Sequence, residues 1–224
     1  MPTTHEHASF VRRNGLSLAF ITLMLLSMAG HALTGWRTDA EERRTHGQSE
    51  QTFSTYLGSA HFLSTLFENW ESEFLQMGLF VLLTAKLRQK GAAESRPLDE
   101  EEETEPAPTP RAQQPWPVRK GGLWLRVYRH SLSSALLLLF AVSMAAHGYN
   151  SWHLHAEEQR LHGEPVSTLA EHLSGPEFWF ESFQNWQSEF LAVVTLVLLS
   201  IVLRERDSTE SKPVEAPHAQ TGTS

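Results

Sequence analysis

Apolar runs alternate with polar segments along the chain, and their lengths are typical of membrane helices. The run from Gly15 to Leu33 reads GLSLAFITLMLLSMAGHAL, the run from Leu132 to Tyr149 reads LSSALLLLFAVSMAAHGY, and neither contains Asp, Glu, Lys or Arg. Two shorter runs, Phe74 to Leu87 and Phe190 to Leu203, reach the roughly 20 residues of a bilayer-spanning helix only together with the aromatic residues before them. A soluble bundle is disfavoured, because two charge-free runs of this length are rare in soluble folds.

The pattern therefore predicts an all-α membrane protein with four transmembrane helices. The expected spans are residues 15–35, 67–87, 131–151 and 183–203. Arg12 and Arg13 before the first run also fit a signal peptide, but the third run lies inside the chain and cannot be one. Because the first run is its counterpart, as described next, we expect the first run to be retained as well.

The two halves of the chain are similar to each other. Residues 13–97 align without gaps with residues 129–213, and about 34 of 85 positions are identical. This register predicts a tandem duplication of a two-span unit, with repeats at 12–91 and 128–206. Because each unit has an even number of spans, the two helical hairpins are expected to run parallel, related by a pseudo-two-fold axis along the membrane normal.

Two segments outside the repeats have the composition of disordered chain. The linker, residues 92–117, contains six prolines and the acidic run Glu100–Glu103, and the tail, residues 207–224, is similarly polar. Neither segment has enough apolar residues to bury a core, so both are predicted to be disordered.

The distribution of charge predicts the orientation in the membrane. Of the 18 Lys and Arg residues, 14 fall within residues 1–14, 86–130 and 204–224. Since Lys and Arg mark the cytoplasmic side, we expect both termini and the linker to be cytoplasmic. The net charge of −8 then belongs mostly to the outer face, where cations are candidate partners, although a plain solvated surface explains the same pattern.

The helices are expected to extend beyond the outer face of the membrane. Helix-forming residues continue from Arg13 to His46, and Gly47 and Gly163 have the positions of C-cap glycines. The fourth helix is expected to begin at Pro176, and its counterpart near Ala60. Between the long helices, FSTYLGS and STLAEHLSG predict short amphipathic helices near the outer interface.

Two His–Glu pairs inside the predicted spans are the main candidate site residues. Counted along the helices at about 1.5 Å per residue, His31 and Glu73 fall at similar depth in the outer leaflet, and His147 and Glu189 repeat this arrangement. Ionisable residues in a membrane indicate function by default, but polar residues also hold helices together by hydrogen bonds. A structural contact, a proton or ion pathway and a metal site that draws on both halves therefore all stay open.

Further polar and aromatic residues recur in both halves near the outer interface. The candidate outer-face cluster comprises Glu42, His46, Glu158, His162, Asn69 and Asn185. The tryptophans expected in the aromatic belt, as interface anchors, are Trp36, Trp70, Trp152 and Trp186.

Several function classes are excluded or find no motif. Without cysteine the chain can form no disulfide, thiolate metal site or cysteine nucleophile, and its acidity disfavours nucleic-acid binding. There is no glycine-rich phosphate loop and no GxSxG, so no cofactor is predicted. EERRTH and EEQRLH separate Glu and His by four residues instead of the three of di-iron bundles, so no metal ligands are assigned.

The segments NGLSLAF, HALTGW, EERRTHG and ENWESEFLQM, with their counterparts in the second half, resemble a family of uncharacterised bacterial membrane proteins, a domain of unknown function. The resemblance covers residues 12–97 and 128–206 and implies a bacterial inner-membrane location but no activity. The second half departs from the first at Gln184 and Gln187, which replace Glu68 and Glu71. A role that needs those carboxylates would belong to the first copy alone.

Together these patterns predict a non-enzymatic four-span membrane protein with a structural, interaction or regulatory role. Its expected partners are the lipid bilayer and either copies of itself or other membrane proteins. The alternative is a small ion or proton transporter or channel that uses the His–Glu pairs. A second alternative is a membrane metal-binding protein or enzyme.

Overall fold

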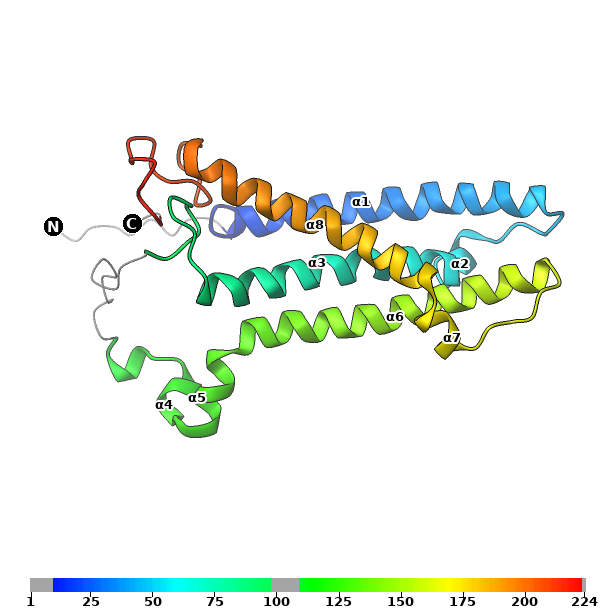
Figure 1. Cartoon of the computed structure of the whole chain (residues 1–224), viewed down its shortest axis with the longest axis horizontal. Helices are drawn as coiled ribbons and strands as arrows, with labels where there is room; N and C mark the ends of the chain where they lie inside the picture. The colour runs from blue at the N-terminus through cyan, green and yellow to red at the C-terminus, as the bar shows by residue number, and fades with distance from the viewer. Residues whose placement is uncertain (1–9, 98–108, 223–224) are drawn as a thin grey trace. The chain divides into compact units, whose positions relative to one another are not determined.

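The computed structural model describes residues 10–97 and 109–222, and the chain divides into two compact units, unit 1 (Met1–Leu63) and unit 2 (Ser64–Ser224). Among the described residues the regular elements are helices, without a strand, which confirms the predicted all-α class. The long helices are α1 (Phe10–Thr45), α3 (Ala60–Lys86), α6 (Ser131–Leu161) and α8 (Pro176–Val202) (Figure 1). The short ones are α2 (Phe53–Tyr56), η2 (Arg111–Gln113), α4 (Trp116–Lys120), α5 (Gly122–Arg129) and α7 (Leu169–Ser174).

Among the described residues, three helices are long and apolar enough to cross a membrane: α1, α6 and α8. Helix α3 has the same length as α8, 27 residues, but it carries Glu68, Glu71 and Glu73 in its first half. A membrane protein is therefore supported by three helices, and the fourth span stays a prediction that depends on where the α3 carboxylates point.

In unit 1, the end of α1 and the loop after it are fixed by local hydrogen bonds. Gly47 has φ +67°, the left-handed conformation of a C-cap glycine, as predicted. The indole N–H of Trp36 donates to the carbonyl of Gln51 over 2.8 Å and holds the loop against the helix. Tyr56 of α2 is fully buried against Gly35, where a Cβ would overlap the tyrosine hydroxyl.

In unit 2, the end of α6 follows the same plan. Gly163 has φ +68°, and the indole N–H of Trp152 donates to the carbonyl of Ser167 over 2.8 Å. A capping box at Thr168 then begins α7. Helix α8 begins at Pro176 and α3 at Ala60, as predicted.

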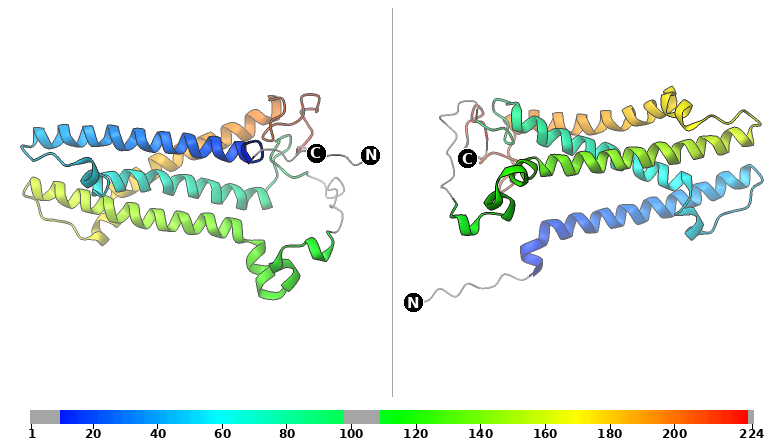
Figure 2. Two further views of the ribbon diagram at one scale, coloured as in Figure 1. Left: turned by 180° about the vertical axis from the view of Figure 1, so that it is seen from behind. Right: turned by 90° about the horizontal axis from the view of Figure 1, so that it is seen from below.

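Helices α3, α6 and α8 run alongside one another within unit 2 (Figures 1 and 2). Most of the buried residues of α6 and α8 are small or polar. The buried residues of α6 are Ser133, Ser143, His147, Gly148, Ser151 and Ala156, and those of α8 are Phe178, Ser182 and Ser200. Large apolar side chains such as Leu138, Leu191 and Leu198 are instead more than half exposed. Small residues between helices with leucines outside are typical of membrane helices, because lipid solvates the leucines.

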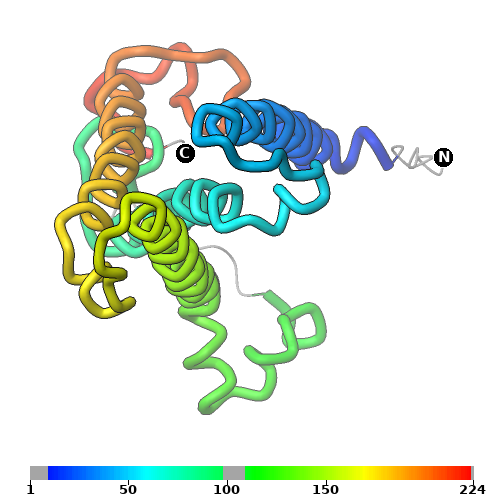
Figure 3. The backbone as a smooth tube through the Cα atoms, turned by 90° about the vertical axis from the view of Figure 1, so that its right-hand side faces the viewer, coloured from blue at the N-terminus to red at the C-terminus, as the bar shows by residue number. Residues whose placement is uncertain are grey.

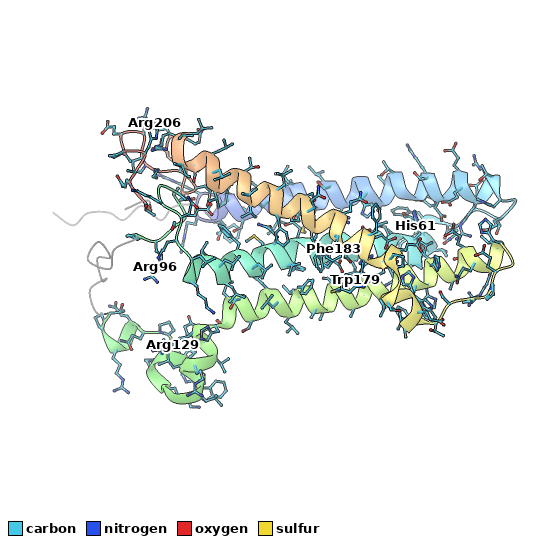
Figure 4. All side chains as sticks on the ribbon, in the orientation of Figure 1. His61, Arg96, Arg129, Trp179, Phe183 and Arg206 are labelled. Atoms are coloured by element: carbon cyan, nitrogen blue, oxygen red, sulfur yellow. The ribbon has the colours of Figure 1, made fainter. Side chains whose placement is uncertain are left out.

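The segments that follow α3 and α8 fold into similar turns. The amide N–H of Gln89 donates to Ser95 Oγ over 2.9 Å, and the amide N–H of Glu205 donates to Ser211 Oγ over 2.9 Å. Arg96, Arg129 and Arg206 all lie at this end of unit 2 (Figure 4). The acidic run Glu100–Glu103 of the predicted linker lies outside the described residues.

The tail after α8 is hydrogen-bonded to the segment after α3. The amide N–H of Gly91 donates to Thr221 Oγ1 over 2.9 Å, and the amide N–H of Gly222 donates to the carbonyl of Ala92 over 3.0 Å. Between these bonds, Glu94 lies within hydrogen-bond reach of Glu210, the residue at its corresponding position. Burial and the neighbouring Glu210 carboxyl raise the pKa of Glu94 from 4.5 to about 7.

We predict that this contact weakens as pH rises. Because the pKa of Glu94 is raised in the docked state, its contribution is fully present below about pH 4.5 and is lost as pH rises through about 7. Hydrogen exchange at the Gly91 and Gly222 amides, corrected for intrinsic rates, should show falling protection over this range. Glu94→Gln should remove the pH dependence, whereas Glu215→Gln, an exposed control in the tail, should retain it. If hydrogen exchange in Glu94→Gln still depends on pH, Glu94 is not the group that weakens the contact.

Candidate functional site

A buried histidine between two carboxylates lies at the centre of unit 2. His147 of α6 is completely buried, and its Nδ1 lies 3.1 Å from Oε2 of Glu71, a fully buried residue of α3. On the other side of the ring, Nε2 lies 3.3 Å from Oε2 of Glu181 on α8. One imidazole therefore joins three long helices.

Hydroxyl groups and a second histidine extend this arrangement. Ser182 donates its Oγ–H to Glu71 Oε1 over 2.9 Å, and Ser151 donates to Glu181 Oε2 over 3.1 Å. Since Ser151 has one hydroxyl hydrogen, its 3.1 Å contact with His172 Nε2 requires His172 to be the donor. We call these six residues (His147, Glu71, Glu181, Ser151, Ser182 and His172) the His147 network.

Helical spacing brings these side chains together. His147 and Ser151 are four residues apart and share one face of α6. On the facing helix, the ring of Phe178 packs one turn before Ser182, with its centroid 5.1 Å from that of His147. The aromatic ring covers one side of the imidazole and limits its rotation.

The short helix α7 positions the outer end of the network. Its capping box orients Glu171, whose pKa is lowered by the hydrogen bonds from the Thr168 backbone and side chain. The helix thereby brings His172 to Ser151. The pKa of His172 is lowered, first because the ring is buried and second because His155 lies beside it, with ring centroids 5.4 Å apart. A neutral His172 agrees with the donor role that Ser151 requires.

The location of the proton in the His147 network is not fixed by the side chains alone. Both ring nitrogens of His147 face carboxylate oxygens, and an imidazole that donates on both sides carries a positive charge. If the ring is neutral, one of the carboxyl groups must hold the proton instead. The network therefore contains one exchangeable proton shared among His147, Glu71 and Glu181.

The same geometry bears on metal binding. A metal ligand needs a free imidazole lone pair, but both nitrogens of His147 already face carboxylates. Over residues 10–97 and 109–222, no group of three or more His, Asp or Glu side chains has an arrangement that could hold a metal ion.

The partner of His147 differs from the predicted one. We expected Glu189, but that residue lies eight positions beyond Glu181 on α8, which is about 12 Å along the helix axis. The structure gives His147 the carboxylates of Glu71 and Glu181 instead. Glu189 is close enough to Glu73 for their charges to interact.

The other predicted pair, His31 with Glu73, joins residues of the two units and stays a prediction. Within unit 1, His31 packs on Phe62 with ring centroids 5.2 Å apart and an interplanar angle of 36°. His147 and Phe178 occupy the corresponding positions of the second half, at 5.1 Å and 37°. Each histidine therefore packs on the corresponding phenylalanine of its own half, with similar geometry.

The outer-face candidates are distributed over separate helix ends. His46 Nδ1 lies 2.9 Å from the carbonyl of Glu42, and His162 Nδ1 lies 2.9 Å from the carbonyl of Glu158. Both rings thus contact backbone carbonyls in the last turn of their own helices, so each pair forms a contact at a helix terminus.

The predicted asparagines and tryptophans also have different surroundings. Asn69 donates to the carbonyl of Thr65 in its own helix, whereas Asn185 donates to the carboxylate of Glu68 across to α3. Trp36 and Trp152 hold loops, as described above. Trp70 packs edge-on against Phe67, and Trp186 packs against Trp179 and Phe183 of α8 and Phe140 of α6.

Four residues of the network (Glu181, Ser151, Ser182 and His172) were not predicted, because positions that are identical in the two halves were favoured, and Glu71 was noted only as a difference between the halves. In the register of the repeat, the positions of Glu71, Glu181, Ser151, Ser182 and His172 carry Gln187, Thr65, Gly35, Leu66 and Tyr56. The signal that was available lies in these differences. Polar residues whose counterparts in the other half differ in charge, polarity or size mark positions where the two halves make different contacts.

Fold and site define a class of protein: an all-helical chain with three helices able to cross a membrane and an ionisable network enclosed between its helices. The chain belongs to the family described as a domain of unknown function, DUF6766, whose sequence profile matches residues 7–223. That single profile spans both halves of the chain. No curated protein and no solved structure matches the chain in similar comparisons.

We predict that His147 holds unit 2 together. His147→Ala leaves two carboxylates without their shared donor and should lower the free energy of unfolding by about 3–5 kcal/mol, as when one partner of a buried ion pair is removed. Combining His147→Leu with Glu71→Leu should recover much of that loss, because the fully buried Glu71 charge is then removed and the partly exposed Glu181 keeps its hydrogen bond from Ser151. Unfolding in detergent, followed by tryptophan fluorescence, measures both effects.

His162→Ala is the matched control, since His162 is exposed and contacts only a helix terminus. Its effect should stay below about 1 kcal/mol. Equal effects of His147→Ala and His162→Ala would contradict a stabilising role for the network.

Proposed function

We propose that the chain is a non-enzymatic, four-span integral membrane protein with a structural, interaction or regulatory role, in which the His147 network holds α3, α6 and α8 together. The observation that carries this proposal is the internal satisfaction of the network. Both nitrogens of His147 and both oxygens of Glu71 have protein partners. Helices in lipid require such internal partners, because the bilayer core offers none.

The enclosure of Glu71 also supports α3 as the fourth span. Carboxylates on α3 would oppose insertion if they faced lipid. The free-energy cost of inserting a charged residue at the centre of a spanning helix is about 2.5–3.5 kcal/mol. Glu71 is fully buried in the network, however, and Glu68 is half-buried and bonded by Asn185. Two of the three α3 carboxylates, Glu68 and Glu71, therefore face protein, whereas Glu73 is exposed.

Recurring local contacts support the proposed duplication. The Trp36 and Trp152 hydrogen bonds span the same number of residues and have the same length of 2.8 Å. The histidine–phenylalanine contacts and the serine-capped turns after α3 and α8 recur likewise. Shared contacts at corresponding positions are expected when one two-helix unit has been copied.

The charge distribution supports an orientation with both termini on the cytoplasmic side. Basic residues gather in the segments before α6 and after α3 and α8, which lie at one end of unit 2 (Figure 4). The loops that follow α1 and α6 would then face outward. The resemblance described above favours the inner membrane of a bacterium.

Cysteine labelling tests the four-span topology, and the chain contains no cysteine of its own. Single-cysteine variants of the full chain at the exposed positions Ser49 and Pro165 should react with a membrane-impermeant maleimide from outside intact cells. Variants at the exposed positions Gln113 and Thr209 should react only after the membrane is opened. Labelling of Ser49→Cys and Gln113→Cys from the same side would contradict a membrane crossing by α3.

A second candidate function is favoured by the continuity of the hydrogen bonds. They lead from His172 on the short helix α7 through Ser151, Glu181 and His147 to Glu71. Chains of His, Glu and hydroxyl groups conduct protons in membrane proteins. The exchangeable proton of the His147 network would be the one that moves.

Proton flux separates the two functions. In vesicles that contain a pH-sensitive dye and are subjected to a membrane potential, the structural proposal predicts that the protein adds no flux to that of empty vesicles. A flux above that level that disappears in Glu71→Gln would assign proton conduction to the network. This variant retains an oxygen for Ser182 but cannot take up a proton, and Glu73→Gln is the control on the same helix.

A further inference from the structure

The short helices before α6 form a segment with an exposed apolar face. Helix α5 separates apolar from polar residues more strongly than the long helices do. Its apolar side chains are largely exposed, at 69% for Leu123, 50% for Trp124, 59% for Val127 and 44% for Tyr128. An exposed apolar face of this kind indicates a surface that contacts something apolar.

Aromatic and basic side chains form an ordered group on this segment. The rings of Trp116 and Trp124 meet edge-on with centroids 5.1 Å apart, and Lys120 Nζ lies 4.8 Å from the centroid of each. This cation–π contact holds α4 against α5. Trp and Lys together are typical of the membrane–water interface, where an aromatic ring and a charged group sit side by side.

The segment is strongly basic. Arg119, Lys120, Arg126 and Arg129 lie within it, and no Asp or Glu occurs anywhere in residues 106–156. This charge complements an anionic surface and opposes a cationic one. Together with the apolar face it has the composition of a helix that lies in the headgroup region of an anionic leaflet.

The backbone turns the segment away from the axis of α6. His130, between α5 and α6, has φ −117° and ψ 11°, which breaks the helix one residue before α6 begins. In Figure 3 the segment stands off from the start of α6 as a separate bend. The same break occurs in α1 at the corresponding position Asn14, with φ −125° and ψ 16°. A helix that leaves the axis of a membrane span at its end reaches the plane of the interface.

We infer that residues 116–129 form an interfacial anchor that binds anionic phospholipids of the leaflet in which α6 begins. Leu123, Trp124 and Val127 enter the boundary between headgroups and acyl chains, and the Arg and Lys side chains contact lipid phosphates. The inference rests on the proposed function only in that α6 must span the membrane. Lipid is favoured over a protein partner because the segment is joined directly to that helix, so headgroups are always within reach.

Quenching by brominated lipids tests this inference on the full chain. Single cysteines at Leu123 and Val127 carry an environment-sensitive fluorophore, and the protein is reconstituted into phosphatidylcholine vesicles with or without about one third phosphatidylglycerol. We expect quenching by lipids brominated on their acyl chains to rise about twofold when phosphatidylglycerol is present, and this gain to fall at high salt. A label at Gln113, in the preceding η2, should show no such gain.

Separate controls test the charge of this segment and the membrane insertion of α6. Arg119→Gln combined with Lys120→Gln and Arg126→Gln should abolish the effect of phosphatidylglycerol on the Leu123→Cys label. A label at Leu138, a side chain of α6 that is 65% exposed, should be quenched in both lipid mixtures and in both backgrounds. Loss of quenching at Leu138 would show that α6 does not span, which is a failure of the proposed function.

Two results would overturn the anchor itself. The first is quenching at Leu138 without quenching at Leu123, which would mean that the segment stays in water. The second is equal quenching at Leu123 with and without phosphatidylglycerol, which would remove the preference for anionic lipid.

Discussion

An ionisable side chain enclosed between helices must find its partners within the protein, and much of unit 2 is organised around this requirement. His147 is completely buried, and α3 and α8 each supply a carboxylate to it. Removing any one of these helices would leave a charge or a hydrogen-bonding group without a partner in an apolar environment. The network thus sets which faces of α3, α6 and α8 meet, while the leucines on the outer faces are free to contact lipid.

The network is also asymmetric, although the two halves of the chain are similar in sequence. Glu71 belongs to the first half and His147, Glu181 and Ser182 to the second, so the contact joins one half to the other. The corresponding position of Glu71 in α8 is Gln187, an uncharged side chain of the same shape.

The two ends of the helices differ in their physical character. At the end of α1, and likewise of α6, a glycine cap and a histidine ring contact the last carbonyls of the helix, and an indole N–H binds a carbonyl of the following loop. At the other end of unit 2, basic residues and the amphipathic α5 lie beside the start of α6. There the segment after α3 and the tail after α8 contact each other at Glu94 and Glu210. The proposed orientation in the membrane rests on this difference between the two ends.

The sequence by itself determined the helical class, the starts of α3 and α8, the glycine caps and the apolar helices, because these depend on local propensity and on the length of apolar runs. It also identified His147 as a residue of interest. It did not determine the partners of His147, since Glu71 and Glu181 lie 76 and 34 residues away and their approach depends on how three helices pack. Depth along a helix, the only coordinate that a sequence supplies, selected Glu189. The actual α8 partner, Glu181, lies about 12 Å from Glu189 along the helix axis. Helix packing sets both how far one helix is shifted along another and how each is rotated, and only the tertiary structure fixes these.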